Sequence, residues 1–298
     1  GFTYIEASLK RGLKIDDFAH RLSFFFNSHM DFFEEIGKYR AARRIWANKL
    51  KNEYGAKNEN SLKLKFHTQT AGCSLTAQQP ENNIVRTAYE AMAAVLGGTN
   101  SLHTNSLDET LALPSEKAAK IALRTQQILA HETGVPNVAD PLGGSWYVEE
   151  ITDRIEEEAN EYFRVIKNLG GTITAIEDGY FQKKISESAS VYQESIDSKE
   201  RIIVGLNDFV DENEKLEIEI LKISQQAQEI QEKKVKKLRK KRDNKSLDKK
   251  MKKLRNACEN NLNLVPYLIE VAELGGTVGE IVELMKGVYG EWEESFGI

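Results

Sequence analysis

The chain has 298 residues, of which 40% are hydrophobic and 29% are charged, and its formal net charge at pH 7 is −5. This is the composition of an ordinary folded protein, long enough for one large domain or two small ones. The net charge gives no overall reason to expect a nucleic-acid partner. The longest apolar runs, such as residues 22–26, fall far short of the ~20 residues that span a bilayer. We therefore expect no nucleic-acid partner, no membrane partner and a cytoplasmic location.

The two cysteines, Cys73 and Cys258, lie far apart in the sequence and predict neither a disulfide framework nor a zinc site. This usage is typical of a reducing compartment, and we expect no metal ligands from this chain. The sequence opens at Gly1 without Met, inside a pattern that indicates an amphipathic helix. We therefore expect a fragment of a longer chain.

Helical and strand patterns alternate over the first 110 residues and then give way to helices. Short apolar or alternating runs predict three strands, at residues 21–27, 62–68 and 101–105. Periodicity predicts helices over residues 2–11, 15–20, 29–50, 82–96, 115–133, 148–168 and 179–198. Three strand–helix units in succession indicate parallel strands, in a barrel or in an open doubly wound sheet. No Gly-x-Gly-x-x-Gly follows a strand, so a dinucleotide fold has no support.

Two further segments carry specific expectations. The helix over residues 82–96 is expected to turn its apolar side chains inward, and these are Ile84, Ala88, Ala91, Met92 and Val95. Residues 202–206 form a lone apolar run that predicts a fourth strand. A full barrel needs eight strand–helix units over ~250 residues, so this chain cannot close a barrel alone.

The average charge hides a basic run between Lys233 and Arg255, which contains 14 basic and two acidic residues. Such a run invites a nucleic-acid or anionic-membrane interpretation. However, no aromatic residue is interleaved with it for stacking on bases, and Leu238, Leu247 and Leu254 recur at helical spacing. We favour a solvated helical hairpin that forms salt bridges with the acidic stretch over residues 211–232.

Polar side chains gather where the predicted strands end, which is where barrels and open α/β sheets both place their sites. His67 and Gln69 lie two apart, so both side chains point to one face of a strand and could polarise one carbonyl oxygen. The alternative is a histidine bonded to a backbone carbonyl and a glutamine that caps the loop.

Asn105 and Glu109 lie four apart, which places them on one face if the segment is helical. A carboxamide and a carboxylate in that arrangement suit the hydroxyls of a sugar. The alternative is a capping box that begins at Ser106.

Three other residues lie near these segments. Arg21 and Ser23 alternate on the first predicted strand and could hold a phosphate or an amide, although a structural pairing of Arg21 is equally open. Cys73 lies in a loop of small residues and is predicted to be a packing thiol.

Seven segments together resemble the large-chain catalytic domain of the methylmalonyl-CoA mutase family, and they follow one another in the family's order over nearly the whole chain. They are Phe2–Ala7, Arg21–Phe26, His67–Thr76, Asn82–Ala88, Ser101–Ser106, Asp140–Tyr147 and Ile202–Asn207.

The resemblance implies a (β/α)8 barrel with an acyl-CoA along its axis, capped by a separate domain or subunit that binds cobalamin and ligates the cobalt. Homolysis of adenosylcobalamin would give the radical that abstracts a substrate hydrogen. For this chain we expect an α/β fold, with the last strand–helix units of a partial TIM-type barrel in residues 1–139. Residues 140–298 would hold the remaining strand and a mainly helical region.

The implied activity is the interconversion of methylmalonyl-CoA and succinyl-CoA, within a homo- or hetero-oligomer. An isobutyryl-CoA or 2-hydroxyisobutyryl-CoA mutase is open, and so is a non-catalytic assembly subunit. The family's N-terminal half of the barrel, with a tyrosine–histidine pair near cobalt, has no counterpart in this sequence. The isolated chain is therefore expected to be inactive.

The resemblance also assigns residues. His67 and Gln69 would contact the acyl thioester and carboxyl region, and Asn105 and Glu109 would hold the ribose of the adenosyl group. The CoA side would be lined by Arg21, Ser23, Phe25, Lys65 and Ser101. Lys65 stands where well-known members carry Arg, which keeps the charge but loses a bidentate donor. Cys73 stands where some relatives carry Trp, so the surface presented to the corrin or adenine differs.

Overall fold

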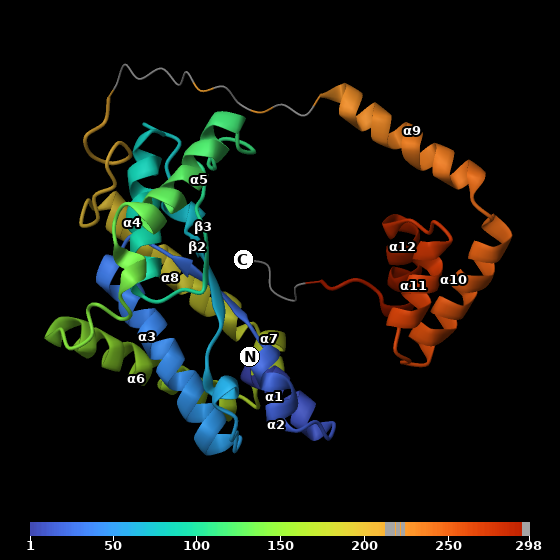
Figure 1. The fold of residues 1–298 in the computed structure, drawn as a ribbon, viewed down its shortest axis with the longest axis horizontal. Coiled ribbons are helices and arrows are strands. Elements are labelled where there is room, and N and C mark those ends of the chain that lie inside the picture. The colour runs from blue at the N-terminus through green and yellow to red at the C-terminus, as the bar shows by residue number, and fades with distance from the viewer. Residues whose placement is uncertain (212–217, 219–220, 222–223, 294–298) are drawn as a thin grey trace. The chain divides into compact units, whose positions relative to one another are not determined.

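The computed structural model describes residues 1–211, 218, 221 and 224–293 (Figure 1). The chain forms two compact units, residues 1–221 and residues 222–298. The first unit combines helices with a small sheet, and helices make up the second in the part that the structure describes. The boundary predicted after residue 139 lies inside the first unit.

The sheet contains three strands: β1 (Phe24–Ser28), β2 (Phe66–Thr70) and β3 (Ser101–His103). They pair in the order β1-β2-β3, and both pairings are parallel, as predicted. Among the described residues, β1 and β3 each pair along one side only. The α/β class is therefore confirmed, and the three strands form an open sheet.

Two of the strands begin later than predicted because short 3₁₀ turns occupy their first residues. Ala19–Arg21 forms one such turn, closed by a hydrogen bond from the Leu22 N–H to the Ala19 carbonyl, so Arg21 and Ser23 precede β1. A second turn over Glu59–Leu62 precedes β2. Alternation of apolar residues alone could not show these turns, because a turn of three or four residues is too short to give a period of its own.

The predicted fourth strand over residues 202–206 is wrong. The segment is a turn with one isolated bridge, between Val204 and Asp208. Gly205 has φ +81°, which an extended strand does not allow, and the Asn207 side chain accepts a hydrogen bond from the Ile203 N–H. A turn in this place satisfies backbone groups within itself instead of along a neighbouring strand.

Eight helices of the first unit fall within a few residues of their predicted bounds, or are short additions to them. Two begin at side-chain caps, where Asp31 accepts from the Glu34 N–H and Ser115 accepts from the Ala118 N–H. The helices are α1 (Phe2–Lys10), α2 (Ile15–Phe18), α3 (Phe32–Asn48), α4 (Asn82–Leu96), α5 (Glu116–His131), α6 (Trp146–Asn168), α7 (Thr172–Glu177) and α8 (Tyr180–Asp197).

In the part of the chain that the structure describes, helices cover one face of the sheet and leave the other open. Helix α4 contacts all three strands. On that side the ring of Phe66 stacks on Tyr39 of α3, with centroids 5.3 Å apart, and Phe26 meets both rings edge-on. Phe66 is 2% exposed, whereas Phe25, one residue along β1 from Phe26, is 60% exposed. We call the side that carries Phe25 the uncovered face.

The inward face predicted for α4 is largely wrong, since only Ala91 of that set is buried. Asn83, Arg86 and Glu90 are buried instead. Ile84, Ala88 and Met92 line a surface groove of about 740 Å³ that α3 and α5 complete. Ala94 on the buried side packs in the cluster that contains Phe66, while Asn83 and Arg86 find hydrogen-bond partners in neighbouring loops.

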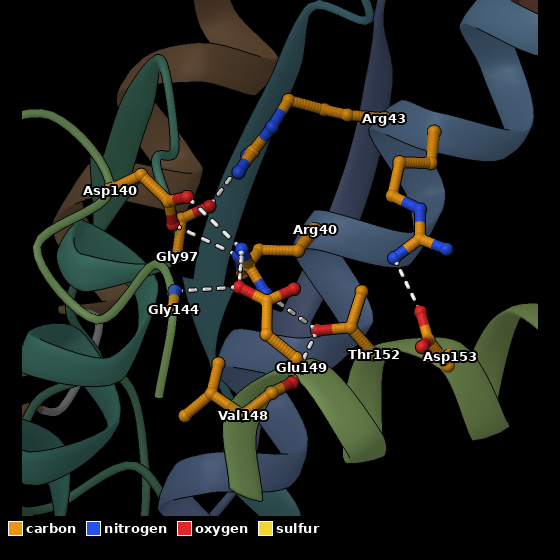
Figure 2. A network of polar contacts seen from close by, with 10 residues as sticks. Arg40, Arg43, Gly97, Asp140, Gly144, Val148, Glu149, Thr152 and Asp153 are labelled. Atoms are coloured by element: carbon orange, nitrogen blue, oxygen red, sulfur yellow. Dashed lines mark hydrogen bonds and ion pairs between the residues drawn. The ribbon is translucent and has the colours of Figure 1, made fainter. Parts of the chain in front are cut away.

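A polar network joins α3 to α6 and to the loop before it (Figure 2). The Arg40 guanidinium donates to both carboxylate oxygens of Asp140, to Glu149 at 2.7 Å and to Thr152 at 3.0 Å. Hydrogen bonds from Arg40, then from the Gly144 N–H, lower the pKa of Glu149 to about 2. The network therefore fixes the segment around residue 140 against the sheet-covering helices.

The second unit is built from α9 (Gln225–Lys241), α10 (Asn244–Glu259), α11 (Val265–Glu273) and α12 (Val278–Tyr289). The last three bury a small apolar core that includes Leu254, Cys258 and Val271. No helix among the described residues is long and apolar enough to cross a membrane.

The basic run lies on α9 and α10, which confirms its helical prediction. Among the described residues, its ion pairs join it both to the predicted stretch and to other helices. Arg242 pairs with Glu280 of α12, and Lys250 pairs with Glu270 of α11. From the predicted acidic stretch, Glu232 pairs with Lys236, and residues 212–217, 219–220 and 222–223 of that stretch lie outside the described part.

Candidate functional site

Three residues predicted from separate segments form one row across the uncovered face. The register places Phe25 of β1 beside His67 of β2, and His67 beside Ser101 of β3. The Phe25 and His67 rings lie 5.0 Å apart between centroids, and His67 Nδ1 lies 2.7 Å from Ser101 Oγ. The aromatic contact and the hydrogen bond together fix the orientation of the imidazole on the open side of the sheet.

A second row of side chains joins two groups that lie apart in the sequence, one containing Gln69 and the other containing Asn105. Gln69 lies beside Asn27 and His103, and its side-chain amide donates to Asn105 Oδ1 at 2.9 Å. The Asn105 N–H in turn donates to Thr70 Oγ1 at 2.8 Å. An amide has two N–H donors, so Gln69 can bond to Asn105 and retain one N–H for a ligand.

Asn105 and Glu109 do not share a helix. Residues 104–106 follow β3 without regular structure, and the chain then turns, with the Glu109 N–H donating to the Ser106 carbonyl. The alternative of a capping box is also not formed, since no helix begins here and the buried Ser106 hydroxyl has no hydrogen-bond partner. The prediction that one face of a helix unites the pair is therefore wrong.

The pair nevertheless presents one donor and one acceptor at the carboxyl end of the sheet. Asn105 is buried, and its Nδ2 atom has no hydrogen-bond partner, whereas Glu109 is exposed. Gly72 passes directly over both, because a Cβ at that position would lie 3.1 Å from Asn105 Nδ2 and 3.7 Å from Glu109 Cγ. Leaving a buried amide nitrogen unbonded costs about 1–3 kcal/mol, so this atom is suited to receive an acceptor from a ligand.

Cys73 lies beside this pair in the 3₁₀ turn Gly72–Ser74. It is a free thiol and it is exposed, so the prediction of a packing thiol is wrong. Ala71 before the turn and Ser74 at its end are the buried residues, and the Ser74 hydroxyl donates to the Ala71 carbonyl.

Three of the five residues predicted for the CoA side lie before the amino ends of the strands, while Phe25 and Ser101 lie in the row with His67. Arg21 and Ser23 precede β1, Lys65 precedes β2, and all three are exposed. The Lys65 ammonium donates to the His20 carbonyl at 2.7 Å, and the Phe24 N–H bonds to the Lys65 carbonyl, so these segments run side by side. The predicted residues therefore divide into a cationic amino-end group and an amide–carboxylate group at the carboxyl end.

One contributor to the site was missed by the sequence reasoning. Thr70, on the covered face of the sheet, positions Asn105 through its hydroxyl, while His103 lies beside Gln69 on the exposed side. A threonine inside a strand carries no sequence signal for this role. Among the described residues, no group of three or more His, Cys, Asp or Glu side chains could hold a metal ion.

Comparison with known proteins gives consistent matches. The model of the family described as Methylmalonyl-CoA mutase matches residues 1–291 of this chain. The large subunit of 2-hydroxyisobutanoyl-CoA mutase from Aquincola tertiaricarbonis is 43% identical over 294 residues, covering 98% of this chain and 52% of that protein. Methylmalonyl-CoA mutase from Rhizobium meliloti is 44% identical, covering 98% of this chain and 41% of that protein.

The human mitochondrial methylmalonyl-CoA mutase is 43% identical over 293 residues, which are 98% of this chain and 39% of the human protein. The chain thus spans about half the length of the relatives that it matches, or less. The match covers the strands, the row through His67 and the pair Asn105 and Glu109 in a single stretch. The chain belongs to the methylmalonyl-CoA mutase family.

Proposed function

We propose that this chain is part of the catalytic domain of an adenosylcobalamin-dependent acyl-CoA mutase, and that the uncovered face of its sheet is the substrate surface. The observation that carries the proposal is the hydrogen bond from Gln69 to Asn105. It joins the residues assigned to the acyl group to those assigned to the cofactor's ribose, and a rearrangement started by a radical needs these two groups next to each other.

The uncovered face supplies the groups that an acyl-CoA requires, in order along the strands. Arg21, Ser23 and Lys65 at the amino ends offer positive charge and a hydroxyl to the CoA portion. Phe25 and Ser101 flank His67, so the imidazole and the free N–H of Gln69 can both donate to the acyl carbonyl. Such donors orient the thioester and stabilise charge that develops on its oxygen.

The residues at the carboxyl end fit the adenosyl group. The buried Nδ2 atom of Asn105, which has no partner, can donate to one ribose hydroxyl, and the exposed Glu109 carboxylate can accept from the other. Cys73 would lie against the corrin or the adenine. When bound, adenosylcobalamin would supply the radical that starts the rearrangement. In this proposal its cobalt is ligated by a separate domain or subunit.

The remaining parts of the proposal concern assembly and substrate. Each edge strand has one side open to a further strand, so β1 and β3 could extend into a (β/α)8 barrel within a homo- or hetero-oligomer. Methylmalonyl-CoA and succinyl-CoA are the proposed substrate pair. One relative is named for 2-hydroxyisobutanoyl-CoA, which makes that thioester, with isobutyryl-CoA, the second candidate to assay. The isolated chain is expected to be inactive.

The test is a Gln69→Ala variant of the assembled enzyme that contains this chain. We expect kcat to fall about tenfold to a hundredfold with little change in KM, because the lost N–H acts on the reacting carbonyl. Gln193→Ala, on an exposed position of α8, is the matched control and should leave both constants unchanged. Steady-state assays with each thioester provide the measurement. Unchanged kcat in Gln69→Ala would reject the catalytic role and support the assembly subunit.

A further inference from the structure

A second recess lies in the first unit and shares no residue with the uncovered face. Its volume is about 340 Å³, and it opens between α4, α8 and the turn at residues 201–204. Its polar lining comes from His29, Ser74, Asn82, Arg86, Tyr192 and Arg201. The proposed function uses none of these side chains.

The recess contains a buried cation that forms no hydrogen bond or ion pair with a carboxylate among the described residues. Arg86 is 9% exposed and donates to three uncharged oxygens, on Thr76, Asn83 and the Val204 carbonyl, at 2.7–3.0 Å. Among the described residues it has no ion-pair partner. Glu90, four residues along α4, is the acid whose charge acts on Arg86, and burial raises the pKa of Glu90 to about 8. Arg86 therefore brings a positive charge to the recess that only uncharged oxygens bond.

A second guanidinium lies at the mouth of the recess. Arg201 is exposed and stands over the ring of Tyr192, 4.9 Å from its centroid. It forms no ion pair with any described residue. Stacking on an aromatic ring fixes the guanidinium plane while its N–H donors stay available.

The third donor is His29, and its hydrogen bonding fixes which nitrogen carries the proton. The Met30 N–H donates to His29 Nδ1 at 2.7 Å, so the neutral ring is protonated on Nε2. Burial lowers the pKa of His29, and Arg201 and Lys38 lower it further, against Glu35 and Asp31. Both acids are already bonded, Asp31 to the Glu34 N–H and Glu35 to Lys38 and Tyr39.

We propose that this recess binds a phosphate group. Two arginines, a histidine and a tyrosine line one small space, and none of the residues that line it carries a carboxylate. Exposed apolar side chains, Val85, Tyr89, Ile202 and Val204, form the adjoining wall and would accommodate an organic moiety carrying that phosphate. The phosphate can therefore be free or borne by a nucleotide.

The experiment follows the imidazole of His29 by NMR in the full 298-residue chain, labelled at histidine and assigned with His29→Gln. Inorganic phosphate and ADP are titrated separately at constant ionic strength, which KCl maintains. We expect a saturable shift of the His29 signals and a rise in the pKa of His29 as the anion binds. Affinity for ADP at least tenfold above that for phosphate would identify the nucleotide form, and equal affinities would identify free phosphate.

Two variants test the placement. Arg201→Gln should weaken phosphate binding about tenfold or more, since it removes a charge-assisted donor. Arg124→Gln, on an exposed position of α5, should leave it unchanged. Arg201 is exposed, so its replacement does not threaten folding. A His29 signal that does not respond to either anion, or an equal response in the Arg201→Gln chain, would overturn the proposal.

Discussion

The two faces of the sheet differ although they alternate along the same strands. The covered face carries Phe66, Thr68 and Thr70, all of them buried beneath α3 and α4. The uncovered face, one residue along each strand, carries Phe25 and His67. Side chains of one strand point alternately to either side, so stability and chemistry are separated by a single step in sequence. A substitution on the covered face should therefore change the stability of the fold, and a substitution on the uncovered face should change ligand binding.

The largest effect is expected from removing a ring on the covered face. Phe66→Ala should lower the free energy of unfolding by about 3–5 kcal/mol, because Phe66 is 2% exposed and packs between Tyr39 and Phe26. Phe25→Ala, on the uncovered face, should cost less than about 1 kcal/mol. Urea unfolding of both variants makes the comparison. Equal losses would show that the two faces do not differ in stability.

The next effect concerns the buried acid on the helix that covers the sheet. Glu90 is fully buried, neither of its carboxylate oxygens makes a well-formed hydrogen bond, and burial raises its pKa from 4.5 to about 8. Nearby Ser74 and Ala71 oppose that rise only in part. The unfolded chain loses the Glu90 proton near pH 4.5 and the folded chain near pH 8, so stability falls as the pH rises between these values.

Glu90→Gln removes this titration. At pH 4.5 the variant should match the parent, whereas at pH 8 it should be more stable by about 2–4 kcal/mol. Urea unfolding at the two pH values measures the difference, and Glu90→Ala is the control for packing, because it should destabilise the chain at low pH. A difference between Gln and Glu that does not vary with pH would contradict the assignment.

The third prediction tests the role proposed for Glu109 in binding the ribose of the adenosyl group. If Glu109 accepts from a ribose hydroxyl, Glu109→Gln and Glu109→Ala should both slow formation of cob(II)alamin in the assembled enzyme, with Ala worse, by up to about 1.5–3 kcal/mol of activation free energy. Stopped-flow absorbance measures this step, and acyl-CoA affinity should hardly change. Normal radical formation together with a lowered melting temperature would instead show a structural role for Glu109.

The smallest effect is expected in the second unit. Replacing Lys236, Lys237, Lys240 and Lys241 by Gln should leave mutase activity within about a factor of two, because solvated charges contribute little individually. Lys236 pairs with Glu232 four residues away, while the interhelical ion pairs use Arg242 and Lys250, which this variant keeps. A salt-dependent loss of binding to a cobalamin subunit would show that the basic run is an interface.

The sequence predicts this fold where one local pattern decides the outcome. Helix α4 has the predicted bounds, since Gly97 and Gly98 follow its last residue. His67 and Gln69 lie on the same face of β2, because side chains two apart on a strand point the same way. The orientation of α4 could not be predicted, because its apolar residues face a surface groove while Arg86 and Glu90 are buried. That choice depends on loops far away in sequence that receive the polar groups.

In the candidate site too, local patterns could be predicted from the sequence and contacts between distant residues could not. The sequence identifies which residue types could bind a carbonyl or a sugar, and it places them near strand ends. It could not show that Gln69 bonds to Asn105, or that Thr70 holds the Asn105 backbone, because these contacts join residues 35 or 36 positions apart. It also treated Cys73 as packed, since small neighbours are common in buried turns and in exposed ones alike.

The network around Arg40 has a consequence for the order of folding. Its hydrogen bond to Thr152 joins residues 112 positions apart. In the second unit the bond between Arg242 and Glu280 spans 38 positions, and its core helices follow one another along the chain. Long loops close slowly, so the helical unit should reach its native contacts first. The sheet and the Arg40 network should then complete folding as the slow phase, which leaves the edges of β1 and β3 unprotected for longest during synthesis.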